Sequence, residues 1–278
     1  GSTSPLLIQG CTKSTRRRSK LLMRDPHVKS LTYVIESAAG SSFDNPPALL
    51  FTNELGDFHM ENGRVTVIPT GHFANEESAR RLIEPFFTSW ELSVDLTRQP
   101  RLIRFKFERV ELIDRDPPPR GTNLIAALTE QINVTTHQAT IHLAYPTYPH
   151  PPANFSATTE VQIIARRWLQ FRDGREPLPS MAYFVLNFLE SKAGGRQKAA
   201  KMLRVEYAIL DKIGELSSTK GGEMDARKVK TVSQFQELKP AEQTWLETAI
   251  RRIIHRFGER AAGTQLEQMV MSDLPELS

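Results

Sequence analysis

The chain has 278 residues, of which 39% are hydrophobic and 24% are charged, as is usual for a globular protein of one or two modest domains. A single cysteine, Cys11, excludes an internal disulfide and a cysteine-based zinc site. The formal net charge is +4, but residues 1–22 contain five basic residues and no acidic one. The rest of the chain has 31 basic and 32 acidic residues, so the positive balance depends on one end of the chain.

Residues 1–22 are predicted to be a disordered basic tail or an extension added to the native chain. Their basic run, residues 16–20, could instead contact nucleic acid or an anionic surface. The segment lacks the apolar stretch and cleavage site of a secretory signal. The longest apolar run, residues 181–189, is too short to cross a bilayer, so no membrane contact is expected. The single cysteine fits a reducing, cytoplasmic setting.

Residues 23–116 are predicted to form a mainly antiparallel β domain. Leu31, Tyr33 and Ile35 alternate with polar residues, which predicts a first strand, and residues 49–53 predict a second. Asn62-Gly63 then separates two alternating segments, and this dipeptide favours the two-residue turn of a β-hairpin. The turn fixes the register, in which Glu61 faces Arg64, Met60 faces Val65, His59 faces Thr66 and Phe58 faces Val67.

A helix is predicted to begin after Asn75, whose side chain suits an N-cap and is followed by two acidic residues. Apolar residues then follow at helical spacing. Pro85 removes a backbone hydrogen bond, so we expect the helix to end near Glu84.

Residues 90–97 carry an apolar side chain at every second position, which predicts a half-buried strand. Pairing this strand with residues 102–114 places apolar residues opposite one another and brings Asp95 opposite Arg104. The alternation in the second segment shifts its phase at Glu108–Arg109, which predicts a β-bulge there.

Residues 117–175 are predicted to be a mixed linker segment, which begins with three consecutive prolines. Within it we expect a helix over residues 123–132, a strand over residues 139–145 and a helix over residues 158–171. The strand could return to the first sheet, in which case the two domains would not be sharply separated at the proline segment.

Residues 176–262 are predicted to form a helical bundle. Residues 180–190 are apolar nearly all round, which places their helix at the centre of the bundle. A further helix is expected over residues 196–216, and a partly helical connection over residues 223–237. Residues 263–278 are polar and are predicted to be a frayed tail. The chain as a whole is therefore expected to be α+β, with an N-terminal antiparallel sheet domain that includes one helix, followed by a C-terminal helical bundle.

The last helix, over residues 240–257, is the segment around which the bundle is expected to form. Pro240 suits its first turn, and Gly258 is expected to end it. Its apolar side chains fall on one stripe, formed by Leu246, Ala249, Ile250, Ile253 and Phe257. Its opposite face holds Thr248, Arg251, Arg252 and His255.

The sequence lacks the glycine-rich nucleotide-binding loops, the serine nucleophile motif GxSxG and the zinc motif HExxH. His59 and His72 flank the predicted hairpin without sharing its register, and His137 and His142 point to opposite faces of a strand. We therefore expect no metal ion and no cofactor, and no catalytic residue is predicted.

One polar cluster remains as a candidate nucleic-acid or anion-binding site, namely Arg251, Arg252 and His255. Arg251 and His255 are four residues apart and so are neighbours on the helix, and guanidinium groups bind phosphate well. The alternative is an ordinary solvated helix face. The bundle is similar in general build to the HEPN ribonucleases, but the three residues between Arg251 and His255 are fewer than in that family, so its activity is not carried over.

The sequence favours a non-enzymatic binding or regulatory protein that uses the outer face of the last helix and the proline-rich loop at residues 145–153. Its partner is expected to be another protein, or a second copy bound through the bundle. Two alternatives stay open. One is a nucleic-acid-binding module or ribonuclease-like enzyme that uses Arg251, Arg252 and His255, and the other is a structural homo-oligomer.

Overall fold

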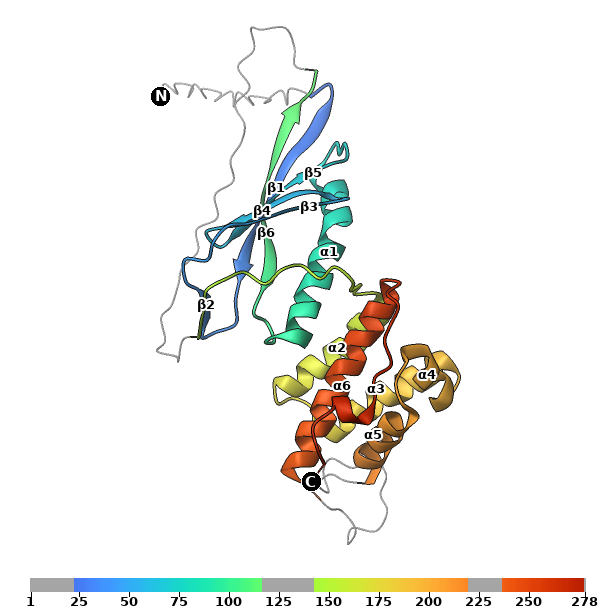
Figure 1. Cartoon of the computed structure of the whole chain (residues 1–278). Helices are drawn as coiled ribbons and strands as arrows, with labels where there is room; N and C mark the ends of the chain where they lie inside the picture. The colour runs from blue at the N-terminus through green and yellow to red at the C-terminus, as the bar shows by residue number, and fades with distance from the viewer. Residues whose placement is uncertain (1–22, 117–142, 220–236, 278) are drawn as a thin grey trace, which may run out of the picture.

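The computed structural model describes residues 23–116, 143–219 and 237–277. They form an N-terminal antiparallel sheet and a mainly helical C-terminal part (Figure 1), so the predicted α+β class is confirmed. None of the helices in these ranges combines the length and the apolar character that a bilayer crossing requires. Three predicted features lie wholly or almost wholly outside the described residues: the tail at residues 1–22, the helix over residues 123–132 and the connection over residues 223–237.

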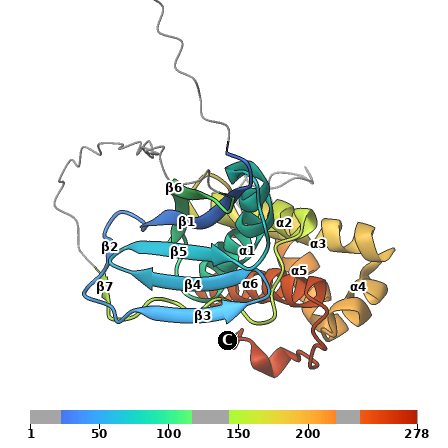
Figure 2. The ribbon, with the colours of Figure 1, turned by 90° about the horizontal axis from the view of Figure 1, so that it is seen from above.

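The main sheet has five antiparallel strands in the order β3-β4-β5-β1-β6 (Figure 2). Their bounds are Pro26–Glu36 (β1), Leu49–Asn53 (β3), Gly56–Glu61 (β4), Arg64–Pro69 (β5) and Arg104–Asp114 (β6). The β4–β5 hairpin has the predicted register, with Glu61 opposite Arg64 and Phe58 opposite Val67. Its turn residues have positive φ angles, 51° at Asn62 and 71° at Gly63, as a type I′ turn requires.

Strand β6 pairs with β1, and not with residues 90–97 as predicted. The predicted bulge is nevertheless confirmed. Two consecutive residues of β1, Thr32 and Tyr33, pair with Arg109 and Phe107, so Glu108 is the extra residue on β6.

Two short strands, β2 (Ser41–Phe43) and β7 (Leu143–Tyr145), form a separate parallel pair (Figure 2). The described end of the strand predicted over residues 139–145 therefore does not join the main sheet. The chain after β7 does return to it, because the hydroxyl of Tyr148 accepts a hydrogen bond of 2.9 Å from the amide of Gly63.

Helix α1 spans Glu76–Thr97, so residues 90–97 are its last two turns and not a strand. The predicted cap is confirmed, because the side chain of Asn75 accepts a hydrogen bond from the amide of Ser78. The predicted end near Glu84 is wrong. Pro85 inside a helix costs about 3 kcal/mol. The burial of large apolar side chains on both sides of it, Ile83, Phe87, Trp90 and Val94, offsets that cost.

Helix α1 contributes to two hydrophobic cores. Ile83, Trp90 and Val94 pack in the core beneath the main sheet. Leu92 and Leu96, on another face of the same helix, belong to the core of the helical part. The helix thus joins the sheet to the helices, and it contacts α6 (Figure 1).

Within the described residues, the helical part contains α2 (Thr159–Arg172), α3 (Leu178–Ala193), α4 (Arg196–Leu203), α5 (Tyr207–Thr219) and α6 (Pro240–Ala261). Helix α3 contacts each of the other four, as its predicted central place requires. Val161 and Trp168 of α2 lie in the same core, so the helical part begins upstream of residue 176. The single helix predicted over residues 196–216 is two helices, because Arg204 adopts a left-handed conformation with φ of 48°.

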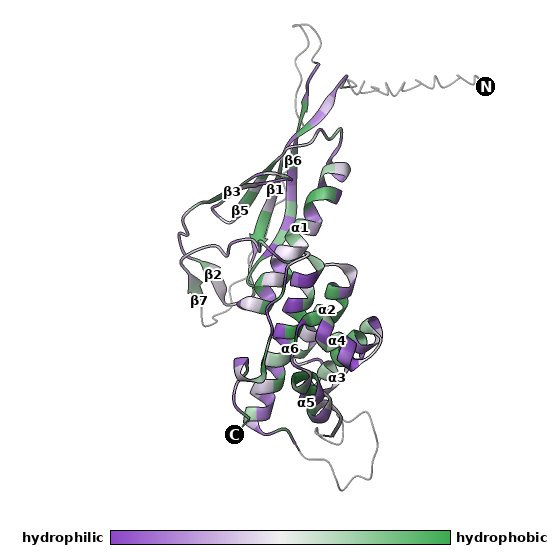
Figure 3. Ribbon diagram, turned by 45° about the vertical axis from the view of Figure 1, so that its right-hand side comes forward, coloured by the Kyte–Doolittle hydropathy of each residue, from purple (hydrophilic) through white to green (hydrophobic). Residues whose placement is uncertain are grey.

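Helix α6 buries four residues of the stripe predicted for it and partly buries the fifth, Phe257. Its alternating hydrophobic and hydrophilic colours in Figure 3 show its two faces. Gly258 does not end this helix, which continues to Ala261. A Cβ atom at Gly258 would lie 2.2 Å from the ring of Phe155. The glycine therefore leaves room for the ring of Phe155, which precedes α2, and Gly263, with φ of 78°, follows the actual end of α6.

The chain after α6 is docked and not frayed. Leu266, Met269 and Leu274 are buried. The amide of Met269 donates to the carbonyl of Arg204, and the carbonyl of Met269 accepts from the amide of Glu206, both at 2.8 Å. The prediction rested on polar composition, but three spaced apolar residues and this backbone pairing hold the segment against the turn between α4 and α5.

Candidate anion-binding site

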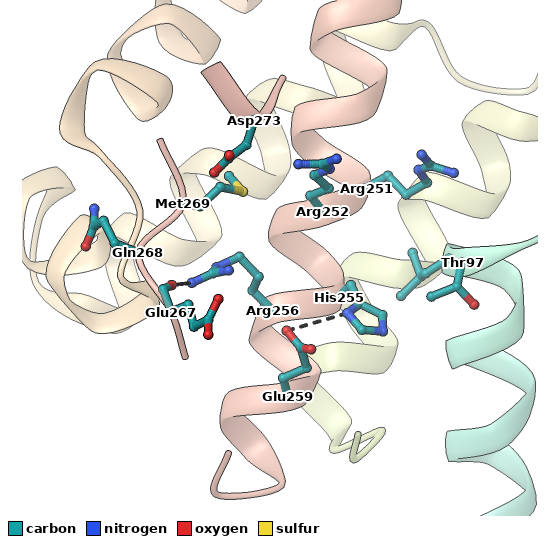
Figure 4. A pocket seen from close by; sticks show the side chains of 11 residues that line it. Thr97, Arg251, Arg252, His255, Arg256, Glu259, Glu267, Gln268, Met269 and Asp273 are labelled. Carbon is teal, nitrogen blue, oxygen red and sulfur yellow. Dashed lines mark hydrogen bonds and ion pairs between the residues drawn. The ribbon is translucent and has the colours of Figure 1, made fainter. Parts of the chain in front are cut away.

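The three predicted site residues line a single pocket of about 350 Å³ (Figure 4). Arg251, Arg252 and His255 form its α6 wall. The other lining residues are Leu96 and Thr97 of α1, Arg256 and Glu259 of α6, and Glu267, Gln268, Met269 and Asp273 of the following segment. The sequence placed the basic residues on one helix face, but the opposite walls come from segments that it predicted to be a strand and a frayed tail.

Arg251 and Arg252 are available to a ligand. Neither side chain forms an ion pair or a hydrogen bond within the part of the chain that the structure describes. Figure 4 shows Arg251 extending on the side of α1 and Thr97, and Arg252 on the side of Asp273. Each guanidinium presents N–H donors in a planar fork, which matches the two oxygens of a carboxylate or phosphate.

Arg256 has a structural role that the sequence analysis missed. Its Nε donates to the carbonyl of Leu203 at 3.1 Å, and its Nη2 donates to the carbonyls of Arg204, at 3.3 Å, and of Glu267. The guanidinium therefore caps the end of α4 and holds the segment after α6 against it. Burial lowers the pKa of Arg256, although a guanidinium stays charged at neutral pH. Its position four residues after Arg252 was the sequence signal for its place in the pocket.

His255 is positioned by two neighbours. Its Nδ1 lies 3.5 Å from a carboxylate oxygen of Glu259, and its ring centroid lies 5.3 Å from that of Phe155. Burial lowers the pKa of His255, and Arg251 and Arg256 lower it further, whereas Glu259 opposes them. The imidazole is therefore neutral at neutral pH and adds no positive charge to the pocket.

Carboxylates balance the arginines around the pocket. The lining contains three carboxylates, those of Glu259, Glu267 and Asp273, and three arginines, so it has no net formal charge. Asp273 also accepts a hydrogen bond of 2.9 Å from the amide of Val270 and so fixes the short 3₁₀ turn η2 (Met271–Asp273). Such a lining suits one or two anionic groups at the arginines, because further charges of a long polyanion would face carboxylates.

The remaining described histidines lie apart from this pocket. His59 is 3.5 Å from Glu61 on the exposed face of β4. His72 lies against His27, a residue that no sequence pattern had indicated. His137 and His142 lie outside the described residues. Among the described residues, no three His, Cys, Asp or Glu side chains are grouped so that they could hold a metal ion.

The fold and the pocket together define an α+β protein with an arginine-lined hollow on its last helix. Comparisons with protein-family models, with curated proteins and with solved structures found no match to this chain. Its function is therefore inferred from the chemistry of the pocket.

Proposed function

We propose that the protein is a non-enzymatic binding protein that holds an acidic segment of a protein partner on Arg251 and Arg252. One observation carries the proposal. Both guanidinium groups line the pocket without a partner among the described residues, whereas Arg256 beside them has its donors engaged by backbone carbonyls. Arginines left open in a hollow bind carboxylates through charge-assisted hydrogen bonds.

The balance of charges favours an acidic peptide over a nucleic acid as the ligand. A peptide can place one or two carboxylates at the arginines and neutral groups beside Glu259 and Glu267. A nucleic acid would bring a phosphate at every nucleotide close to those carboxylates. The alternative function as a nucleic-acid-binding or ribonuclease-like protein also needs His255. The ring of His255 already contacts Glu259 and Phe155, so it is less open to a ligand than the two arginines.

Replacing both arginines by alanine should weaken the binding of a fluorescent, end-capped peptide with two adjacent glutamates flanked by glycine and serine about a hundredfold or more. Two charge-assisted hydrogen-bonding groups are lost, each worth about 1.5–3 kcal/mol. The measurement is fluorescence anisotropy at a series of salt concentrations. The stability of the variant should stay within about 0.5 kcal/mol of the parent, because neither side chain has a partner to lose.

The matched control is Arg109→Ala with Arg166→Ala, which removes the same charge from two exposed arginines outside the pocket. It should leave peptide affinity nearly unchanged. Equal weakening by both double variants would mean that only net charge matters and would contradict the proposal. Tight, Arg251-dependent binding of a single-stranded RNA in place of the peptide would favour the nucleic-acid alternative. Light scattering on the same samples tests the homo-oligomer alternative.

A further inference from the structure

Four polar side chains meet where β1 begins, away from the arginine pocket. His27 Nδ1 lies 3.1 Å from His72 Nδ1, and the two rings are nearly parallel, with centroids 5.0 Å apart. The guanidinium of Arg115 lies 3.0 Å from His27 Nε2, and Asp25 Oδ1 lies 3.5 Å from His72 Nε2. Asp25 precedes β1, His27 lies in it, His72 follows β5 and Arg115 follows β6, so the group connects three segments of the sheet.

The chemistry of Arg115 fixes the direction of every hydrogen bond in the group. A guanidinium can only donate, so His27 Nε2 must accept, and the proton of the neutral ring is on Nδ1. His27 Nδ1 then donates to His72 Nδ1, which leaves the proton of His72 on Nε2, facing the carboxylate of Asp25. Arg115, His27 and His72 thus form one chain of donors and acceptors that is complete only when both rings are neutral, and the carboxylate of Asp25 lies beside its end.

Protonation of either ring breaks this chain. A second proton on His27 would place an N–H against the guanidinium of Arg115 and a positive charge beside another. A second proton on His72 would place two N–H groups face to face between the rings. Asp25 attracts a charged ring, but it is half-exposed and on the far side of His72 from His27.

Backbone hydrogen bonds join the same three segments around the four side chains. The amide of Val28 donates to the carbonyl of Phe73 at 2.8 Å, and the amide of Arg115 donates to the carbonyl of Asp25 at 2.9 Å. The carboxylate of Asp114 accepts a further hydrogen bond of 2.9 Å from the amide of Asp25. These bonds tie the start of β1 to the loop after β5 and to the end of β6.

We propose that Asp25, His27, His72 and Arg115 form a pH-sensitive latch, which closes this end of the sheet at neutral pH and opens as the solution becomes acidic. His72 is 44% exposed at its side chain, so solvent protons reach the latch directly. His27 is only 8% exposed, so its ring takes on a charge in place only at the cost of desolvation.

The direction of the pH dependence follows from the burial of His27. Burial lowers the pKa of His27, and Arg115 and His72 lower it further, whereas Asp25 opposes them. The open form therefore binds more protons than the closed form as the pH falls below about 6.5, the usual value for histidine. Closure is complete above that value and is lost as the pH falls toward the lowered pKa.

Hydrogen exchange of the full chain tests the latch. Between about pH 7.5 and about pH 5.5, on either side of the usual histidine pKa, protection of the Val28 and Arg115 amides should fall about tenfold. This is the factor expected when one hydrogen bond to a charged group is lost. Rates are corrected for intrinsic exchange, and the amides of the β4–β5 hairpin serve as an internal reference. The loss of protection should have the same midpoint as the ring protons of His27, followed by NMR.

Two substituted variants distinguish the effect of the latch from the effect of protonating other histidines. The variant His27→Asn with His72→Asn keeps polar groups in place but cannot titrate, so the Val28 and Arg115 amides should show no pH-dependent loss of protection. His59→Asn, at an exposed position on β4, should behave as the parent does. The proposal is overturned if the parent protein shows no loss at Val28 beyond that of the hairpin, or if the double variant keeps the full loss.

Discussion

Replacing Asp95 by alanine should lower the free energy of unfolding by about 3–5 kcal/mol, the cost of breaking a buried ion pair from one side. The side chain is 1% exposed. Its carboxylate accepts hydrogen bonds from both terminal nitrogens of Arg104, at 3.0 and 2.7 Å, and from the amide of Arg101 at 2.6 Å. Alanine would leave the amide of Arg101 and Nη2 of Arg104 without this acceptor, whereas Nη1 of Arg104 would keep the carbonyl of Ile103. Urea unfolding followed by the fluorescence of the three buried tryptophans measures the loss.

Two further variants separate the buried pair from ordinary charge effects. Glu36→Ala removes an exposed partner of Lys106 and should cost at most about 1 kcal/mol. Burial raises the pKa of Asp95, although Arg104 opposes this effect, so the charge is costly to keep inside. Asp95→Leu with Arg104→Met should therefore lose less stability than Asp95→Ala alone. If Asp95→Ala cost no more than Glu36→Ala, the buried pair would contribute little to the fold.

The contact between Asp95 and Arg104 was predicted from the sequence, but for the wrong structural reason. An alternating pattern over residues 90–97 suggested a strand, with the two residues facing each other across a hairpin. The residues are instead the last turns of α1, and the pair joins the end of this helix to the first residue of β6.

The alternation has a simple helical explanation. Trp90 and Val94 are four residues apart on the face toward the sheet, and Leu92 and Leu96 are four apart on the face toward the helices. A helix buried on two sides therefore shows the same spacing as a half-buried strand. Only the presence of a second core distinguishes the two patterns, and that core is formed by distant parts of the chain.

Features that depend on a few neighbouring residues were predicted well. The Asn62-Gly63 turn, the Asn75 cap and the bulge at Glu108 all follow from local backbone chemistry, and the structure shows each of them. Helical periodicity likewise placed Arg251 and Arg252 on the outer face of α6. The rest of the pocket was not predictable in this way, because its other walls and the partners of Arg256 come from α1, α4 and the chain after α6.

Replacing Gly258 by alanine should destabilise the protein by about 2–3 kcal/mol, even though alanine favours a helix over glycine by about 1 kcal/mol. The new Cβ would lie 2.2 to 2.7 Å from three ring atoms of Phe155. That ring cannot move away easily, because Phe155 is 7% exposed and the next amide, of Ser156, donates to the carbonyl of Gly258 at 3.1 Å. Urea unfolding of the parent and the variant gives the difference.

A second helical glycine provides the matched control. The three atoms nearest to a Cβ at Gly214 belong to the guanidinium of Arg196, the end of a side chain that can shift although it pairs with Glu190 and Asp211, so Gly214→Ala should cost less than Gly258→Ala. Removing the ring of Phe155 should also reverse the sign of the stability change that Gly258→Ala causes. In a Phe155→Ala background, Gly258→Ala should be neutral or stabilising, because only helix propensity remains. A loss at Gly258 that persists without the ring would show that glycine is required there for its backbone and not for the space it leaves to Phe155.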